Sequence, residues 1–161
     1  MNITLYDLAQ RFIGTTEISG TLDNPHILAM LKLDNKWPEN DEVPWCSAFV
    51  NYVAWLLRLP RSKSLRARSW LSVGKPISIY LAIPGYDIVI IKRKESDPGP
   101  EVLEYQGHVG LYSGSEFGNV YILGGNQSNT VNITPYNRNR LLGIRRLYDE
   151  LNLENSISKL I

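Results

Sequence analysis

Three residue types used in covalent acyl transfer occur in this chain in the order Cys46, His108 and Asn126. Cys46, the only cysteine, opens the most apolar stretch of the sequence. A thiol in the first turn of a helix meets the positive end of the helix dipole and free backbone N–H groups, which stabilise the reactive thiolate and can bind an oxyanion. A buried, inert cysteine is the alternative interpretation of this position.

His108 is the second candidate. It opens a strand pattern and is flanked by Gly107 and, two residues later, Gly110, which leave the imidazole room and let other backbone approach closely. A histidine on a strand beside the helix of Cys46 is placed to act as a general base. A hydrogen-bonded histidine without catalytic function explains the same pattern. His26 lies in a helical pattern with no polar cluster, and we assign it no role.

The third candidate lies in the segment 124–127 (GGNQ), after an apolar strand pattern. An amide here could accept a hydrogen bond from the imidazole and hold its tautomer. Successive side chains of an extended strand point to opposite faces, so either Asn126 or Gln127 faces His108. We favour Asn126 and keep Gln127 as the alternative. A Gly-Asn turn without function is the competing interpretation.

Helical patterns in the first half of the chain position the cysteine. Thr4 with Asp7 predicts a capping box, and Asn24-Pro25 predicts the start of a second helix. Residues 45–59 carry only a narrow polar stripe, which predicts a helix buried on almost every side. A short basic helix is expected over 61–71.

The second half reads as short strands, which carry the histidine and the amide. We expect strands over 87–92, 108–112, 120–123, 131–134 and 142–147, separated by turn residues. Helices followed by consecutive strands predict an α+β fold with an antiparallel sheet of about five strands. We expect a single domain over 1–161, helical over about 1–75 and stranded over about 84–148.

Composition excludes several functions. Lys plus Arg number 17 and Asp plus Glu 16, a net charge of +1, which argues against non-specific nucleic-acid binding. One cysteine excludes an internal disulfide and a Cys-rich zinc site. No apolar run is long enough to span a membrane. The first twelve residues lack the features of a secretory signal, so we expect synthesis in the cytoplasm.

Taken together, these motifs resemble the papain-like bacterial and phage cell-wall hydrolases of the NlpC and CHAP (cysteine, histidine-dependent amidohydrolase/peptidase) group. The resemblance covers about 45–145, and the W-C-S-A-F block followed by G-H-V-G is its most specific part. The matching segments are 44–50 (PWCSAFV), 67–70 (ARSW), 84–89 (PGYDIV), 107–110 (GHVG), 124–127 (GGNQ) and 141–145 (LLGIR).

The resemblance implies a papain-like fold and hydrolysis of an amide bond in peptidoglycan, within the peptide or between glycan and peptide. Cys46 would be the nucleophile, His108 the base and then the acid, and Asn126 the orienting residue. The third position varies in the group, so Gln127 stays open. The backbone N–H of Cys46 would bind the oxyanion. This thioester chemistry needs no metal or cofactor.

Further residues of the matched segments are candidates for substrate binding. Trp45 and Trp70 could line a groove, although tryptophan more often packs in a core. Arg68 could meet a substrate carboxylate, and Gln127 is a further contact candidate.

Two features depart from the pattern of the group. Tyr86 separates Gly85 from Asp87, which favours a structural role for Asp87 at the start of its strand. Some CHAP relatives bind calcium, but Asp34, Asp41 and Glu42 are too scattered for us to expect that site.

Two other functions remain open. The same triad could transfer the acyl group to an amine, as in transglutaminases, or the domain could be a non-catalytic wall-binding or phage-structural module. As a hydrolase, it would act on the cell wall after release or delivery, as a bacteriolytic phage endolysin, an injected toxin with an immunity protein, or a tail-associated enzyme with a phage structural partner. We expect a monomer.

Overall fold

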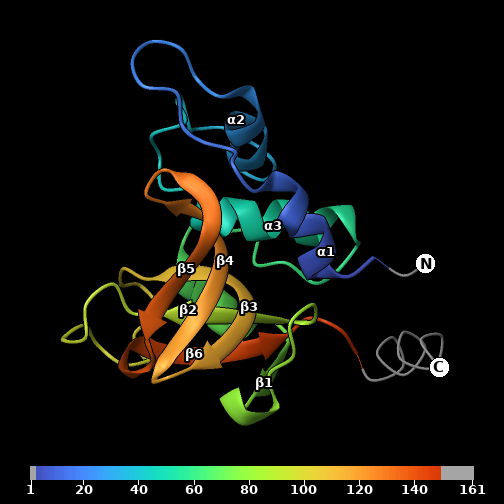
Figure 1. Ribbon diagram of the computed structural model, residues 1–161. Helices are drawn as coiled ribbons and strands as arrows, with labels where there is room; N and C mark the ends of the chain where they lie inside the picture. Colours follow the sequence, from blue (N-terminus) through green and yellow to red (C-terminus); the bar gives the residue numbers. More distant parts are fainter. Residues whose placement is uncertain (1–2, 150–161) are drawn as a thin grey trace.

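An antiparallel sheet forms the larger layer of the protein, seen here in a computed structural model that describes residues 3–149 (Figure 1). The strand order is β1-β6-β2-β3-β4-β5, and all neighbours run antiparallel. The strands are β1 (Lys75–Ile77), β2 (Asp87–Ile91), β3 (His108–Glu116), β4 (Asn119–Gln127), β5 (Thr130–Asn137) and β6 (Leu141–Arg146). The predicted α+β class and the five predicted strands are confirmed.

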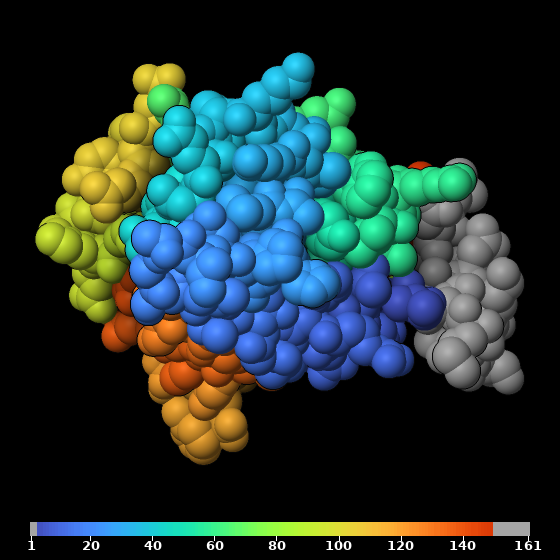
Figure 2. Space-filling view, turned by 90° about the horizontal axis from the view of Figure 1, so that it is seen from above, coloured from blue at the N-terminus to red at the C-terminus, as the bar shows by residue number. Residues whose placement is uncertain are grey.

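The three α-helices of the described residues gather on one side of this sheet (Figure 1). They are α1 (Leu5–Ala9), α2 (Pro25–Leu31) and α3 (Cys46–Leu56), with 3-10 turns at Gln10–Phe12, Ala67–Ser72, Ile79–Leu81 and Arg138–Arg140. Seen from above, the N-terminal segment covers the middle of the molecule (Figure 2), which agrees with the burial of α3. No helix within residues 3–149 is long and apolar enough to cross a bilayer.

Local side-chain caps begin the first two α-helices, as the sequence predicts. Thr4 Oγ1 accepts from the backbone N–H of Asp7 at 3.1 Å, and Asp7 Oδ2 accepts from the N–H of Thr4 at 2.9 Å. Asn24 Oδ1 accepts from the N–H of His26 at 2.9 Å. Each cap stabilises its helix by about 1 kcal/mol.

The helix that begins with Cys46, α3, is buried along most of its length between the sheet and the N-terminal helices. Its polar stripe is satisfied internally, because Ser47 Oγ donates to the Ser64 carbonyl at 2.6 Å and Asn51 Nδ2 donates to the same oxygen at 3.1 Å. The helix ends at Leu56, three residues before the predicted end, because the chain turns into a left-handed conformation at Arg58 (φ 56°).

The expected basic helix over 61–71 is wrong; only the 3-10 turn Ala67–Ser72 forms there. Side chains compete for the backbone N–H groups that a helix would need. Asn51 Oδ1 accepts from the N–H of Lys63 at 3.0 Å, and Ser64 Oγ accepts from the N–H of Arg66 at 3.2 Å. The segment therefore runs as an irregular strap beside α3.

Strand β1 was not expected from the sequence. It is three residues long, pairs with β6 and includes Pro76. Such short strands carrying proline are typical of sheet edges, and they have too few residues to show the alternation by which a strand is recognised.

Both faces of the sheet are covered near its centre. One face packs against the helices through Ile88, Ile90, Val109, Leu111 and Leu123. The other carries a smaller cluster that includes Val89, Ile91, Tyr112, Ile122 and Ile144. All five residues of β2 are buried, which fixes the start of its partner β3, where His108 lies.

Candidate active site

The imidazole of His108 is hydrogen-bonded to the side-chain amide of Gln127. His108, 7% exposed, is the first residue of β3, and its Nε2 lies 2.9 Å from Gln127 Oε1 at the end of β4. The amide nitrogen of Gln127 donates to the carbonyl and to Oδ1 of Asn132, at 2.7 and 2.8 Å. The Gln127 oxygen therefore faces the imidazole and can only accept, so Nε2 carries the ring hydrogen and Nδ1 is the free ring nitrogen.

The preference for Asn126 over Gln127 is wrong in this structure, and a β-bulge is the reason. Gly124 pairs with Asn132 and Gln127 with Thr130, so two residues of β4 stand opposite one residue of β5. Asn126 takes up the extra length in a left-handed conformation (φ 56°). The alternation shifts by one residue, and Gln127 reaches the imidazole, while Asn126 lines the pocket that His108 and Gln127 also line.

Cys46 lies against the beginning of β3, at the backbone of Val109, the residue that follows His108. The thiol, 3% exposed, is on the first residue of α3. Burial raises the pKa of the thiol, and hydrogen bonds from the backbone N–H groups of Val109, Ser47 and Cys46 itself lower it only in part. Val109 directly follows His108, so the structure brings the thiol and the imidazole-bearing strand together.

The imidazole is held neutral at physiological pH. Burial lowers the pKa of His108 to about 4, against an opposing effect of the Gln127 hydrogen bond, and the charges of Arg93 and Arg140 lower it further. Since burial also raises the pKa of Cys46, the resting pair is a neutral thiol and a neutral imidazole.

Arg93 is a residue of the site that the sequence analysis missed. Its Nε donates to the carbonyl of Gly107 at 3.3 Å, and its charge lowers the pKa of both Cys46 and His108. The position of Arg93 could have indicated it. Arg93 lies two residues after Ile91, the last residue of β2, and Ile91 pairs with His108 in the sheet.

Tyr136 was also missed. Its ring centroid lies 5.5 Å from that of His108, and its hydroxyl donates to Gln127 Oε1 at 3.1 Å. Burial raises the pKa of Tyr136, and the nearby Cys46 contributes in the same direction. Tyr136 lies on a different strand from Gln127 and nine residues away in the chain, so local sequence carries no signal for this contact.

Two pockets flank the Cys46 and His108 side chains, and Arg93 lines both. The first has a volume of about 500 Å³, and its lining includes Cys46, Arg66, Ala67, Arg93, Glu104, Tyr105 and Gln106. The second, of about 340 Å³, is lined by residues that include His108, Asn126, Gln127, Arg93, Tyr136 and Arg140. An extended substrate lying across both would pass the thiol and the imidazole.

The two tryptophans proposed as groove residues are core residues instead. Trp45 and Trp70 have no exposed surface. Trp45 Nε1 donates to Glu17 Oε1 at 2.8 Å, and its ring packs so closely on Gly125 that a Cβ there would lie 2.5 Å from it. Trp70 Nε1 donates to Ser47 Oγ at 2.9 Å. Both position α3 rather than substrate.

Arg68 is likewise not available to substrate. It is fully buried, and its guanidinium donates to the carbonyls of Pro98, Gly99, Val102 and Gln106 at distances of 3.1, 2.8, 2.9 and 2.7 Å. These bonds hold the loop between β2 and β3, part of which lines the Cys46 pocket. The predicted role in substrate binding is therefore corrected to positioning of that loop.

Two of the acidic residues considered from the sequence, Asp87 and Asp34, form ion pairs. Asp87 pairs with Arg146 at 2.8 Å and accepts from the N–H of Ile83 at 2.7 Å, which supports the predicted structural role. Asp34 pairs with Arg61 at 2.6 Å. Among residues 3–149, no group of three His, Cys, Asp or Glu side chains is arranged to hold a metal ion.

No protein-family model and no curated protein matches this chain. The assignment of an activity therefore depends on the geometry of the site and on the sequence motifs.

Proposed function

We propose that the protein is a papain-like cysteine amidohydrolase that cleaves an amide bond of peptidoglycan through a thioester. The observation that supports this best is the 2.9 Å hydrogen bond between His108 Nε2 and Gln127 Oε1. The next residue of the strand, Val109, donates its backbone N–H to the Cys46 thiol. Cys46 is the nucleophile, His108 the base and then the acid, and Gln127 replaces Asn126 as the positioning residue.

The reaction begins with transfer of the thiol proton of Cys46 to Nδ1 of His108 as the sulfur attacks the amide carbon. Backbone N–H groups at the start of α3 donate to the oxyanion, and the cation of Arg93 stabilises its charge. The imidazolium then protonates the leaving amine, and the C–N bond breaks. Water, deprotonated by His108, cleaves the resulting thioester and releases the acid.

A neutral Cys46 thiol and a neutral His108 imidazole are suited to proton transfer that accompanies the attack of the sulfur. Both pKa shifts favour the uncharged thiol and imidazole, so charge separation develops only as the carbon–sulfur bond forms. Interactions that strengthen only in the transition state raise the rate constant rather than the binding of substrate.

Peptidoglycan as the substrate is supported by the motif resemblance and by the charge of the cleft. Arg66, Arg93 and Arg140 line the two pockets beside the catalytic pair, with Glu104 as their acidic neighbour. Peptide stems that carry free carboxylates would be bound by such a basic rim.

The test is digestion of purified peptidoglycan by the wild type and by Cys46→Ala, with mass spectrometry of the released fragments, which also identifies the bond cut. We expect release by the wild type and none by the variant, with replacement of the exposed second histidine, His26→Ala, as the control that retains activity. Equal release by Cys46→Ala would refute the proposal. Incorporation of an added amine in place of water would assign acyl transfer instead.

A further inference from the structure

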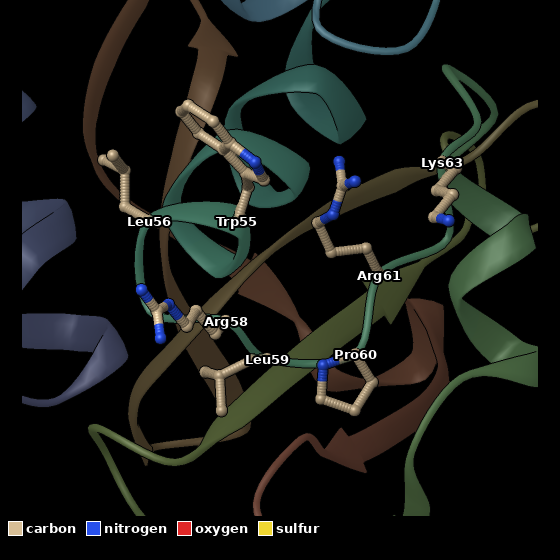
Figure 3. A pocket seen from close by; sticks show the side chains of 7 residues that line it. All are labelled: Trp55, Leu56, Arg58, Leu59, Pro60, Arg61 and Lys63. Atoms are coloured by element: carbon tan, nitrogen blue, oxygen red, sulfur yellow. The ribbon is translucent and has the colours of Figure 1, made fainter.

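A second site lies at the opposite end of α3 from Cys46, where the helix ends (Figure 3). It is a pocket of about 560 Å³ lined by Trp55, Leu56, Arg58, Leu59, Pro60, Arg61 and Lys63. The eleven residues of α3 span roughly 16 Å, so this pocket is separate from the catalytic pair.

The lining combines an exposed apolar surface with cations. Trp55 is 46% exposed and Leu56 42%. Arg61 is held in the wall of the pocket by its 2.6 Å ion pair with Asp34. Arg58 and Lys63 are exposed, and within residues 3–149 neither side chain has a hydrogen bond or ion pair. No described residue that lines the pocket is acidic, so it attracts an anion.

The backbone gives an independent observation. Arg58 and Lys63 have φ angles of 56° and 54°, in the left-handed region that glycine favours. Arg58 follows the C-cap of α3, where the N–H of Leu59 bonds to the Ala54 carbonyl at 2.9 Å, a motif in which glycine is usual. The long cationic side chains of Arg58 and Lys63 are therefore attached to backbone positions in a strained conformation. Backbone strain of this kind clusters at functional sites.

The pocket is connected to the catalytic cleft by the irregular strap beside α3. Lys63 lines this pocket, and Leu65 and Arg66, two and three residues further on, line the pocket of Cys46. In Figure 2, the segment near residue 60 (blue-green) lies at the surface beside the N-terminal segment. A polymer held at the end of α3 could therefore continue along the strap to the thiol.

We infer that this pocket binds an anionic sugar unit of a cell-wall polymer. The sugar ring packs on the exposed indole of Trp55, and its carboxylates or phosphates meet the cations of the lining, Arg58 on one side of the pocket and Lys63 on the other (Figure 3). The anionic character follows from the lining alone, whereas the choice of a sugar rests on the proposed function.

Calorimetric titration of the Cys46→Ala variant tests this, because binding is measured without hydrolysis. The probes are peptide-free glycan strands with lactyl carboxylates, poly(N-acetylglucosamine 1-phosphate), and neutral chitotetraose. We expect at least one anionic polymer to bind, about tenfold or more above the neutral one, and to weaken with salt. Comparison of the two polymers identifies the carboxylate or the phosphate as the anion.

Arg58→Gly and Lys63→Gly are the decisive variants, because glycine relieves the left-handed backbone while it removes the charge. Each should raise the melting temperature and weaken anion binding about fivefold or more. Unchanged affinity in both variants, equal binding of chitotetraose, no binding of either anionic polymer, or tighter binding of an oligonucleotide would each overturn the inference. Binding that persists while peptidoglycan hydrolysis is absent would refute only the proposed function.

Discussion

Asn132 determines which end of the Gln127 amide faces His108. Its carbonyl and side-chain oxygens accept from Gln127 Nε2 at 2.7 and 2.8 Å, and its own amide nitrogen donates to the Gln127 carbonyl at 3.0 Å. A flipped Gln127 would place its oxygen against these two acceptor oxygens and its amide N–H groups against the imidazole, so both hydrogen bonds to Asn132 would be lost. The β4–β5 bulge thus orients the imidazole through the Asn132 side chain.

Replacement of Gln127 by Ala should lower kcat of the proposed hydrolysis about 10- to 100-fold, because an imidazole free to rotate loses its productive alignment. Asn126→Ala, one residue away, should lower kcat less, because Asn126 lines the same pocket while the hydrogen bond to His108 comes from Gln127. The measurement is kcat on purified peptidoglycan or a fragment of it. A larger loss in Asn126→Ala than in Gln127→Ala would contradict this assignment.

The free energy of unfolding should fall between pH 6.5 and 5. The folded-state pKa of His108 is about 4, below its ordinary 6.5, so over this interval the unfolded chain takes up a proton that the folded protein does not. Stability present above pH 6.5 is therefore lost on acidification, by about 2 kcal/mol at pH 5. Urea unfolding at both pH values measures it, and His108→Gln should reduce the difference.

How far the site could be predicted depends on how local its signals are. Cys46 and His108 could be proposed as candidates because an apolar stretch and flanking glycines are visible in a few consecutive residues. Gln127 was given second place because a bulge depends on how β4 pairs with β5, which no local alternation reveals. The same holds for Arg68, whose burial depends on a loop more than thirty residues away in the chain.

The fold divides in the same way. Caps at Thr4 and Asn24 and the strongly apolar β2 were predictable, because their signals lie within a turn or a strand. The strap after α3 was mistaken for a helix, since its basic composition permits one, but Asn51 and the strap's own serines take its backbone hydrogen bonds.

Arg93→Gln should raise the pKa of the Cys46 thiol, because it removes a cation that favours the thiolate. Arg93 is exposed and solvent screens its charge, so the rate of alkylation at pH 8 should fall by about threefold at most. Iodoacetamide alkylation rates across pH measure the change. Arg140→Gln is the matched control: the Arg140 charge acts on His108, and the Cys46 rate should stay the same. An equal slowing in both variants would contradict the specific role of Arg93.

Arg68→Met should destabilise the protein by about 3 kcal/mol or more, because it leaves carbonyl groups of the β2–β3 loop without their buried donor. Its neighbour Arg66, whose ion pair with Glu104 is largely exposed, should change stability by no more than about 0.5 kcal/mol when replaced by Met. Urea unfolding of both variants makes the comparison. Since the loop also lines the pocket of Cys46, Arg68→Met should raise KM in the fraction that remains folded, although Arg68 itself touches no substrate. A stable Arg68→Met protein with an unchanged KM would show that the loop keeps its position without this guanidinium.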